Sequence, residues 1–196
     1  MKRLFDIIVS LIALTIFLPF GIIIAVSILL SSKGGVFYRQ QRIGKNGIPF
    51  SLWKFRTMKP DSDKFGQLTV GMNDIRITKI GGFLRRYKLD EFPQFINVFM
   101  GEMSVVGPRP EVEKYVNLYN DEQRKVLRVR PGITDYASLE YFKENEILGN
   151  ADDPERTYID EVMPAKLALN KKYLMNPGIL RDFKIMWLTF LKMVKR

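Results

Sequence analysis

Hydrophobic residues dominate the amino-terminal stretch of the chain. From Leu4 to Leu30 the run is interrupted only by a few small or polar residues and, near its middle, by Pro19. As one straight helix it would be about 40 Å long, which exceeds the roughly 30 Å hydrocarbon core of a bilayer. Its length, and the lack of a small-residue cleavage site after it, favour a retained membrane segment over a signal peptide.

Pro19 leaves two membrane arrangements open, because proline removes a helix hydrogen bond and clashes with the preceding turn. One is a kinked helix that spans the bilayer; the other is a re-entrant helix-break-helix that enters and leaves by one leaflet. Positive residues lie on both sides of the run, at Lys2 and Arg3 before it and at Lys33 and Arg39 after it. Positive flanks suit two cytoplasmic ends, yet the residues alone leave the two arrangements equally open.

Alternating short segments after the run predict a small β element. Ser31 to Gly35 is a turn, and Val36 to Tyr38 is a short strand. Gly44 to Gly47 predicts a second turn, and Pro49 to Phe55 a second strand. The polar stretch from Lys59 to Asn73 contains glycine and proline and is typical of a loop.

Helical spacing of apolar residues predicts several helices beyond this loop. Asp74 is expected to begin a helix over 75–87, and Asp90 and Glu91 to lie at the start of another that continues to Met100. Further elements predicted from the same patterns are a loop over 104–110, a helix over 111–128, a rigid turn over 130–134, an irregular acidic stretch over 135–153 and a helix over 160–173.

The last segment, from Gly178 to Arg196, has one aromatic, apolar face and one cationic face. Its apolar stripe consists of Leu180, Phe183, Trp187, Phe190, Leu191 and Val194. Such a helix is typical of a membrane interface, and a helix packed on the domain core has the same periodicity. We therefore predict an α+β fold, mainly helical, in three parts: a membrane segment over 1–33, a compact cytosolic domain over 34–177 that holds the small β element and any catalytic site, and an amphipathic helix over 178–196.

Composition narrows the chemistry that this chain can perform. The 196 residues, 46% of them hydrophobic, are enough for one packed domain with an appendage, which argues against global disorder. The formal charge of +10 points to an anionic partner, namely nucleic acid, an acidic membrane or a phosphorylated molecule. The chain has no Cys and no His, so thiol nucleophiles and imidazole bases are absent and carboxylates and cations must do any chemistry.

The adjacent carboxylates Asp90 and Glu91 are the strongest candidates for that chemistry. They follow a basic cluster that includes Arg85. An ionised carboxylate can act as a nucleophile without a base, and a second carboxylate can hold Mg²⁺ together with substrate phosphates. An Asp-Glu dipeptide alone more often marks an exposed helix start, so the pair predicts phosphoryl transfer only with support from its surroundings.

Cations that could bind phosphate oxygens surround this pair in the sequence. Arg109 lies between Pro108 and Pro110, which restrict its backbone and therefore the reach of its guanidinium. Arginine binds phosphate through two nitrogens at once. The candidate phosphate-binding cations are Arg85, Arg109, Lys54 and Arg56, although Lys54 and Arg56 also fit a solvated basic face.

Several segments together resemble the bacterial sugar transferase family of small, monotopic phosphoglycosyl transferases. In the family's order they are Val36–Gly44, Trp53–Met58, Arg76–Gly81, Leu89–Gln94, Asn97–Val98, Gly101–Pro110 and Arg130–Thr134. Each segment alone is weak evidence, but the ordered set covers most of residues 1–135 and is highly specific.

The resemblance implies an activity and a place in the cell. Such enzymes move a sugar 1-phosphate from a UDP-sugar to polyprenyl (undecaprenyl) phosphate, releasing UMP and giving a polyprenyl diphosphate sugar. This is the first membrane step in making capsule, exopolysaccharide, O-antigen or glycoprotein glycans. The expected location is the bacterial inner membrane with the catalytic domain facing the cytoplasm, and a second copy of the chain is a candidate partner, whereas nucleic acid is not.

The resemblance also implies residue roles. Asp90 matches the nucleophile, which carries the phosphosugar covalently, and Glu91 matches the residue of the Mg²⁺ site. Arg85 and Arg109 match arginines at the phosphates, and Lys54 a basic position. The substrate-binding set that we predict is Lys54, Arg56, Arg85, Pro108, Arg109, Pro110 and Arg130, and the family's re-entrant break matches Pro19, which favours the re-entrant arrangement.

The chain departs from the family's pattern at several positions. Leu18 replaces the small polar residue that often precedes the membrane proline, and Asp135 and Ser138 replace a usual Gly and Gln. An unusual segment, Leu139 to Phe142, follows, and the carboxyl-terminal third resembles the family weakly. The donor sugar is therefore undetermined, and Asp160 is most simply a helix-start residue.

Two other classes of function fit parts of the sequence. A non-catalytic membrane-surface scaffold would use the basic surface to bind acidic lipid. A membrane-tethered nucleic-acid-binding module would use the same charge, but no helix-turn-helix, zinc or RNA-binding motif supports it.

Overall fold

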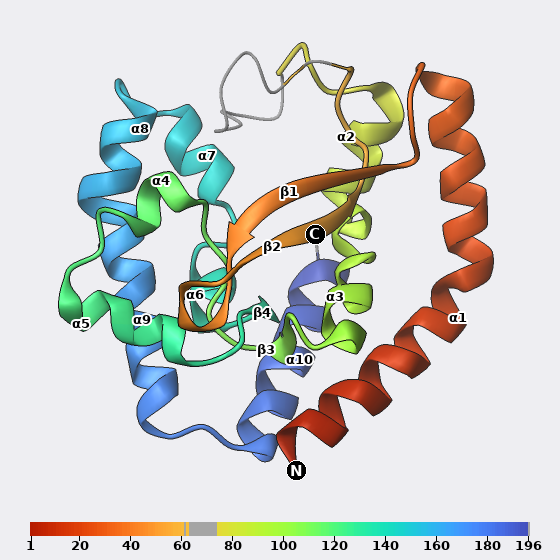
Figure 1. Cartoon of the computed structure of the whole chain (residues 1–196). Coiled ribbons are helices and arrows are strands. Elements are labelled where there is room, and N and C mark those ends of the chain that lie inside the picture. The colour runs from red at the N-terminus through yellow and green to blue at the C-terminus, as the bar shows by residue number, and fades with distance from the viewer. Residues whose placement is uncertain (61, 63–73, 196) are drawn as a thin grey trace.

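A computed structural model describes residues 1–60, 62 and 74–195, and it is mainly helical with two small β pairings (Figure 1). The prediction of an α+β, mainly helical chain is thereby confirmed. The loop predicted over 59–73 falls largely outside the described residues.

The amino-terminal helix α1 (Lys2–Ser31) runs along one side of the molecule and bends partway along its length (Figure 1). Pro19 lies inside this helix, and the chain is helical on both sides of it, so the re-entrant break at Pro19 stays a prediction. Proline commonly kinks a helix without ending it when the turns on either side keep their hydrogen bonds. By length and composition α1 could cross a membrane, and most of its large apolar side chains are exposed.

The amino-terminal end of α1 is fixed to the folded domain by polar contacts. Lys2 forms a 2.5 Å ion pair with the buried Asp182, and Arg3 donates to the Val98 carbonyl at 2.6 Å. Asp6 is buried within the apolar run because its carboxylate accepts two hydrogen bonds of 3.0 Å, from the Ser104 hydroxyl and from a neighbouring backbone N–H. A buried carboxylate needs such donors, since burial without them is costly.

The other end of α1 is fixed to the same domain. Ile28 is buried in a cluster with Phe55 and Leu84, and Arg56 donates to the Ser32 carbonyl at 2.8 Å. Both ends of the long apolar helix therefore rest on one folded body.

The antiparallel strands β1 (Phe37–Ile43) and β2 (Pro49–Phe55) form the predicted β element. They are joined by the short turn η1 (Lys45–Gly47), in which Asn46 and Gly47 have φ values of 57° and 77°. The second strand is confirmed, whereas the first is longer than predicted because the alternation of burial continues to Ile43.

Three short elements follow in chain order: helix α2 (Lys79–Arg86), the 3₁₀ turn η3 (Leu89–Glu91) and helix α3 (Gln94–Met100). Thr78 begins α2, because its hydroxyl accepts from the Gly81 N–H at 2.9 Å. The prediction that Asp74 caps this helix is wrong; Asp74 forms a 2.5 Å ion pair with Arg76 instead.

The segments predicted as a loop and a rigid turn pair with one another as parallel strands β3 (Ser104–Val106) and β4 (Gly132–Thr134). Their backbones approach so closely that a Cβ on Gly132 would lie 2.1 Å from the Gly107 nitrogen. Periodicity could not reveal this pairing, since each strand has only three residues.

The carboxyl-terminal half consists of short helices around two long ones. In order they are α4 (Glu113–Val116), α5 (Asp121–Arg124), η4 (Lys125–Arg128), α6 (Tyr136–Glu140), α7 (Glu144–Gly149), α8 (Pro154–Thr157), the π-helical turn η5 (Tyr158–Val162), α9 (Met163–Met175) and α10 (Ile179–Val194). The single helix predicted over 111–128 is wrong, because a capping box at Asn120 begins a new helix there.

The carboxyl-terminal helix α10 packs on the domain with one face, and its placement in a membrane interface stays a prediction. Ile185 and Asp182 are fully buried against the domain, whereas Leu180 and Trp187 are exposed. One face of α10 therefore packs on the core and another offers apolar side chains to the surroundings.

We expect Gly132→Ala to destabilise the protein by about 3 kcal/mol or more, because the new Cβ would overlap backbone that cannot move away. Gly178→Ala is the matched control, since nothing lies within 4 Å of a Cβ at that position, and it should cost less than about 1 kcal/mol. Thermal unfolding of both variants in one detergent measures the difference. Equal losses would contradict the close approach of β3 and β4.

Candidate active site

The Asp90–Glu91 pair lies in η3, between α2 and α3. Lys88 adopts a left-handed conformation, with φ of 57°, and so redirects the chain from α2 into this turn. Asp90 is only 7% exposed, and its buried Oδ1 has no hydrogen-bond partner among the described residues. An unpaired buried carboxylate oxygen is costly and is characteristic of sites kept ready for a ligand or a reaction.

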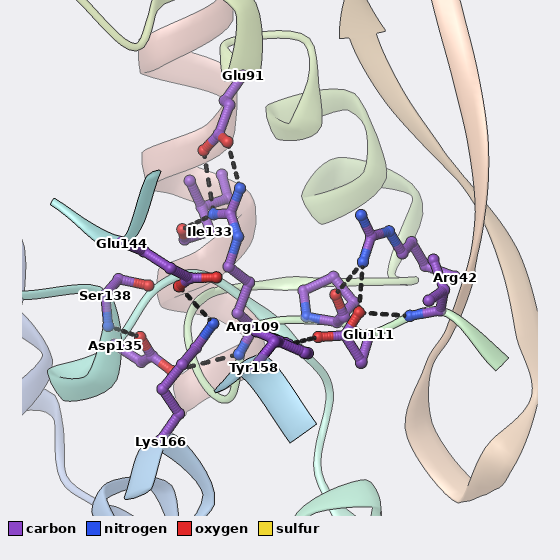
Figure 2. Close-up of polar contacts among 12 residues, drawn as sticks. Arg42, Glu91, Arg109, Glu111, Ile133, Asp135, Ser138, Glu144, Tyr158 and Lys166 are labelled. Atoms are coloured by element: carbon purple, nitrogen blue, oxygen red, sulfur yellow. Dashed lines mark hydrogen bonds and ion pairs between the residues drawn. The ribbon is translucent and has the colours of Figure 1, made fainter. Parts of the chain in front are cut away.

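Glu91 forms a bidentate ion pair with Arg109 (Figure 2). Arg109 Nη1 lies 3.0 Å from Glu91 Oε2, and Nη2 contacts Oε1. Lys54 Nζ lies 3.7 Å from Oε1. Burial acts to raise the pKa of Glu91, but the charges of Arg109 and Lys54 outweigh it and hold that pKa well below its ordinary value.

Asp90 is shifted in the opposite direction. Burial, followed by the charge of Glu91, raises the pKa of Asp90, and Lys54 and Arg85 oppose that rise. Two adjacent carboxylates with opposite shifts often have different roles. Here Glu91 is held as an anion, whereas Asp90 keeps a more basic oxygen.

Lys54 and Arg85 bring two further cations to this pair. Lys54 is on β2, and burial lowers its pKa to about 8, against the opposing charge of Glu91. Arg85 is in the last turn of α2 and donates through Nε to the Thr57 hydroxyl at 2.9 Å. Burial lowers the pKa of Arg85, and the charge of Asp90 opposes that change. Thr57, which the sequence did not single out, therefore orients a predicted phosphate-binding arginine.

The Pro108–Arg109–Pro110 loop is held at each of its three residues. The Pro108 carbonyl accepts from the Gly132 N–H at 2.9 Å, and the Arg109 N–H donates to Asp135 Oδ2 at 3.3 Å. Arg42 Nη1 donates to the Pro110 carbonyl at 3.2 Å. These contacts, together with the two fixed proline rings, place the guanidinium of Arg109 opposite Glu91.

Two predicted substrate-binding residues contact other parts of the chain. Arg56 donates to the Ser32 and Lys33 carbonyls at the end of α1, and Arg130 donates through Nε to the Gly101 carbonyl at 2.7 Å. Their assignment to the substrate remains a prediction. Asp160 is exposed and pairs with Arg156 at 3.4 Å, within the same helical stretch.

A second group of charged residues, which the sequence did not predict, surrounds Arg109 (Figure 2). Glu111 pairs with Arg42 at 2.9 Å and accepts from the Tyr158 hydroxyl. Glu144, which adds negative charge near Arg109, pairs with Lys166 at 2.8 Å. Arg42 lies in a segment that resembles the family, but Tyr158 and Lys166 lie in the weakly similar third, where no pattern marked them.

The carboxylate pair offers oxygen ligands to a hard cation. Among the described residues no three acidic or other metal-ligating side chains gather in one group. Mg²⁺ is commonly held by one or two carboxylates together with substrate phosphates, so a site of two carboxylates is compatible with it. The unpartnered Oδ1 of Asp90 leaves one oxygen of the pair available to a ligand or a substrate.

Taken together, the fold and this site define a class: a membrane-associated protein whose carboxylate pair lies among cations fit to bind an anion. The comparison with known proteins is consistent with that class, since all of residues 1–196 match the bacterial sugar transferase family. The chain therefore belongs to the bacterial sugar transferase family.

Three relatives illustrate the similarity. A UDP-glucose:undecaprenyl-phosphate glucose-1-phosphate transferase of Klebsiella pneumoniae is 39% identical over 97% of this chain. A putative undecaprenyl-phosphate N-acetylgalactosaminyl 1-phosphate transferase of Bacillus subtilis is 43% identical over 62% of it and is covered over 68% of its own length. The exopolysaccharide production protein PSS of Rhizobium leguminosarum bv. phaseoli is 36% identical over 100% of this chain and is covered over 96% of its length.

The relatives differ in size. This chain spans 39% of the Klebsiella protein and 40% of a similarly named Escherichia coli protein. The similarity to these two relatives therefore covers only a part of each relative.

We expect Glu91→Gln to lower the free energy of unfolding by about 3 kcal/mol at neutral pH, because it leaves Arg109 without its charged partner. Since the folded pKa of Glu91 is depressed, its contribution is present above its unfolded pKa of about 4.3 and is lost as the pH falls below that value. The difference in the free energy of unfolding between wild type and variant should therefore become smaller at acidic pH. Denaturant unfolding at pH 7 and at lower pH measures it.

Glu146→Gln is the matched control for this change. Glu146 pairs with Lys143 at 3.1 Å on the surface, with both side chains well exposed, so its loss should change stability by less than about 0.5 kcal/mol. A Glu91→Gln variant as stable as the Glu146→Gln variant at pH 7 would contradict the importance of the buried pair.

Proposed function

We propose that this protein is a phosphoglycosyl transferase that moves a sugar 1-phosphate from a UDP-sugar to polyprenyl phosphate, releasing UMP. The observation that carries the proposal is the buried, unpartnered Oδ1 of Asp90 beside Glu91, with Lys54, Arg85 and Arg109 around the pair. Family membership and the activities for which the relatives are named support the same reaction.

The proposed chemistry proceeds through two displacements at one phosphorus. Asp90 Oδ1 attacks the phosphorus bonded to the sugar, the bond from that phosphorus to the UMP oxygen breaks, and UMP departs with the bonding electron pair. An oxygen of polyprenyl phosphate then attacks the same phosphorus, and the Asp90 carboxylate leaves with its electrons. The product is polyprenyl diphosphate sugar, and Asp90 is restored.

The cations of the site would stabilise the charge that this chemistry concentrates on phosphate oxygens. Arg109 and Arg85 can bind such oxygens through paired nitrogens, and Lys54 adds a compact charge. Burial strengthens these interactions, because charges interact more strongly away from water. The raised pKa of Asp90 makes its oxygen more nucleophilic while the nearby cations still favour the ionised form.

Glu91, with Asp90 beside it, would hold Mg²⁺. When bound, the ion would neutralise phosphate charge and so reduce repulsion between the substrate and the anionic nucleophile. Because Glu91 is paired with Arg109, we propose that a bound diphosphate competes for the guanidinium and leaves Glu91 free to serve as a ligand.

We further propose that α1 is re-entrant and that the domain faces the cytoplasm. Lys2 and Ile28 lie near opposite ends of α1, yet both contact the same folded domain. A helix that crossed the bilayer would put its ends on opposite sides of about 30 Å of hydrocarbon. The exposed apolar side chains of α1 and α10 would then face lipid, placing the site at the boundary where a soluble donor can meet a lipid-linked acceptor.

We propose a UDP-sugar as the class of donor. The names of the relatives carry different sugars, glucose in one and N-acetylgalactosamine in another. The pathway is proposed only as glycoconjugate synthesis, of which exopolysaccharide production is the example that the relatives' names supply.

Incubation of the purified protein with Mg²⁺, undecaprenyl phosphate and a panel of UDP-sugars tests the reaction. We expect UMP release from at least one donor, a loss of at least 10³-fold in Asp90→Asn, and loss on chelation of the metal. Asp160→Asn, a change of the same kind at an exposed carboxylate, should leave the rate unchanged. A folded protein that releases no UMP from any donor would exclude the proposed function.

Cysteine labelling tests the topology cleanly, because the chain has no native cysteine. One variant carries a cysteine added at the amino terminus, another Lys33→Cys, and a control Glu146→Cys on the exposed surface of the domain. An impermeant maleimide should label all three only after spheroplasts are permeabilised. Labelling of the amino-terminal cysteine in intact spheroplasts, with none at position 33, would show a spanning helix instead.

A further inference from the structure

Asp135 is a buried carboxylate that the proposed reaction does not use. It follows β4 directly, at a position where the sequence departs from the family's usual glycine, and it is 0% exposed. A buried carboxylate is costly unless donors surround it, so its contacts indicate its role.

Asp135 accepts two backbone hydrogen bonds, one through each carboxylate oxygen. Oδ1 accepts from the Ser138 N–H at 2.6 Å and so caps α6. Oδ2 accepts from the Arg109 N–H at 3.3 Å. Proline has no N–H, so Arg109 carries the single backbone donor of the Pro108–Arg109–Pro110 loop, and Asp135 is its acceptor.

Arg109 is thus held at both of its ends (Figure 2). Asp135 binds its backbone, while Glu91 and, at 3.4 Å, the Ile133 carbonyl bind its guanidinium. The Asp135 charge also favours the cationic form of Arg109. Catalytic cations lose much of their effect when displaced by about 1 Å, so a group that fixes the arginine backbone can influence the rate without touching substrate.

We propose that Asp135 is a positioning residue, whose carboxylate fixes the backbone of Arg109 so that the guanidinium lies beside Glu91. The effect on catalysis rests on the proposed function, whereas the hydrogen bond between Asp135 and the Arg109 N–H does not depend on it. Asp135 takes no part in bond making or breaking.

The Asp135→Asn variant distinguishes the positioning of Arg109 from the capping of α6. Asparagine caps helices as well as aspartate does, so the variant should keep α6 and fold normally. The asparagine side chain, however, has only one acceptor oxygen. If that oxygen caps α6, the NH₂ group of the same side chain faces the Arg109 N–H, and two donors cannot form a hydrogen bond with each other. A capping role alone predicts an unchanged enzyme, whereas a positioning role predicts a fall in kcat/KM of tenfold or more, up to about 100-fold. Asp153→Asn is the matched control, because Asp153 caps α8 in the same way.

A spectroscopic measurement examines the contact independently of activity. In protein labelled with ¹⁵N-arginine, the Arg109 amide is assigned by the loss of its signal in Arg109→Lys. We expect its hydrogen exchange to quicken at least tenfold in Asp135→Asn and to stay unchanged in Asp153→Asn.

The outcomes separate the two proposals. Faster exchange together with a lower kcat/KM supports the positioning role. Wild-type exchange and wild-type kcat/KM in Asp135→Asn would overturn it, and so would faster exchange with an unchanged kcat/KM. A wild-type protein that releases no UMP from any donor removes the reaction itself, and the catalytic role of Asp135 with it, whatever the exchange rate.

Discussion

The ion pair between Glu91 and Arg109 is the interaction on which the rest of the site depends. Both side chains are largely buried, and burying their charges costs free energy. That cost is offset only if two nitrogens of the guanidinium bind the two carboxylate oxygens. The pair joins two distant segments of the chain, the η3 turn and the proline-flanked loop, so its geometry depends on how each segment is held. Lys88 fixes the first through its left-handed conformation, and the close pairing of β3 with β4 fixes the second.

The same segments connect the site to the membrane helix. The Val98 carbonyl, on α3 shortly after the carboxylates, accepts from Arg3, and Asp6 holds the first residues of β3 just before the arginine loop. At the other end of α1, Ile28 packs with Leu84 of α2. Because α1 rests on the elements that place Asp90, Glu91 and Arg109, its position on the domain and the geometry of the site cannot vary independently.

Local patterns predicted a large part of this arrangement. The alternation of Pro49–Phe55 and the amphipathic stripe of α10 could be read from neighbouring residues. The sequence also singled out Glu91 and Arg109, which the structure brings together. What the sequence could not predict depends on contacts between distant segments. Asp135 becomes an acceptor for Arg109 only because β3 and β4 pair, and Glu111 meets Tyr158 across 47 positions. The course of α1 at Pro19 is a related case, because a proline removes one helix hydrogen bond but does not determine whether the helix continues beyond it.

The central claim is that Asp90 carries the phosphosugar while Glu91 remains an anion beside it. The most direct measurement is the intact mass of the protein after brief mixing with Mg²⁺ and an accepted UDP-sugar in the absence of polyprenyl phosphate, followed by peptide mapping. We expect one added sugar phosphate, located on the peptide that contains Asp90, removed on addition of polyprenyl phosphate and absent from Asp90→Asn. Turnover of the donor with no adduct on this peptide, or an adduct that persists in Asp90→Asn, would contradict the account.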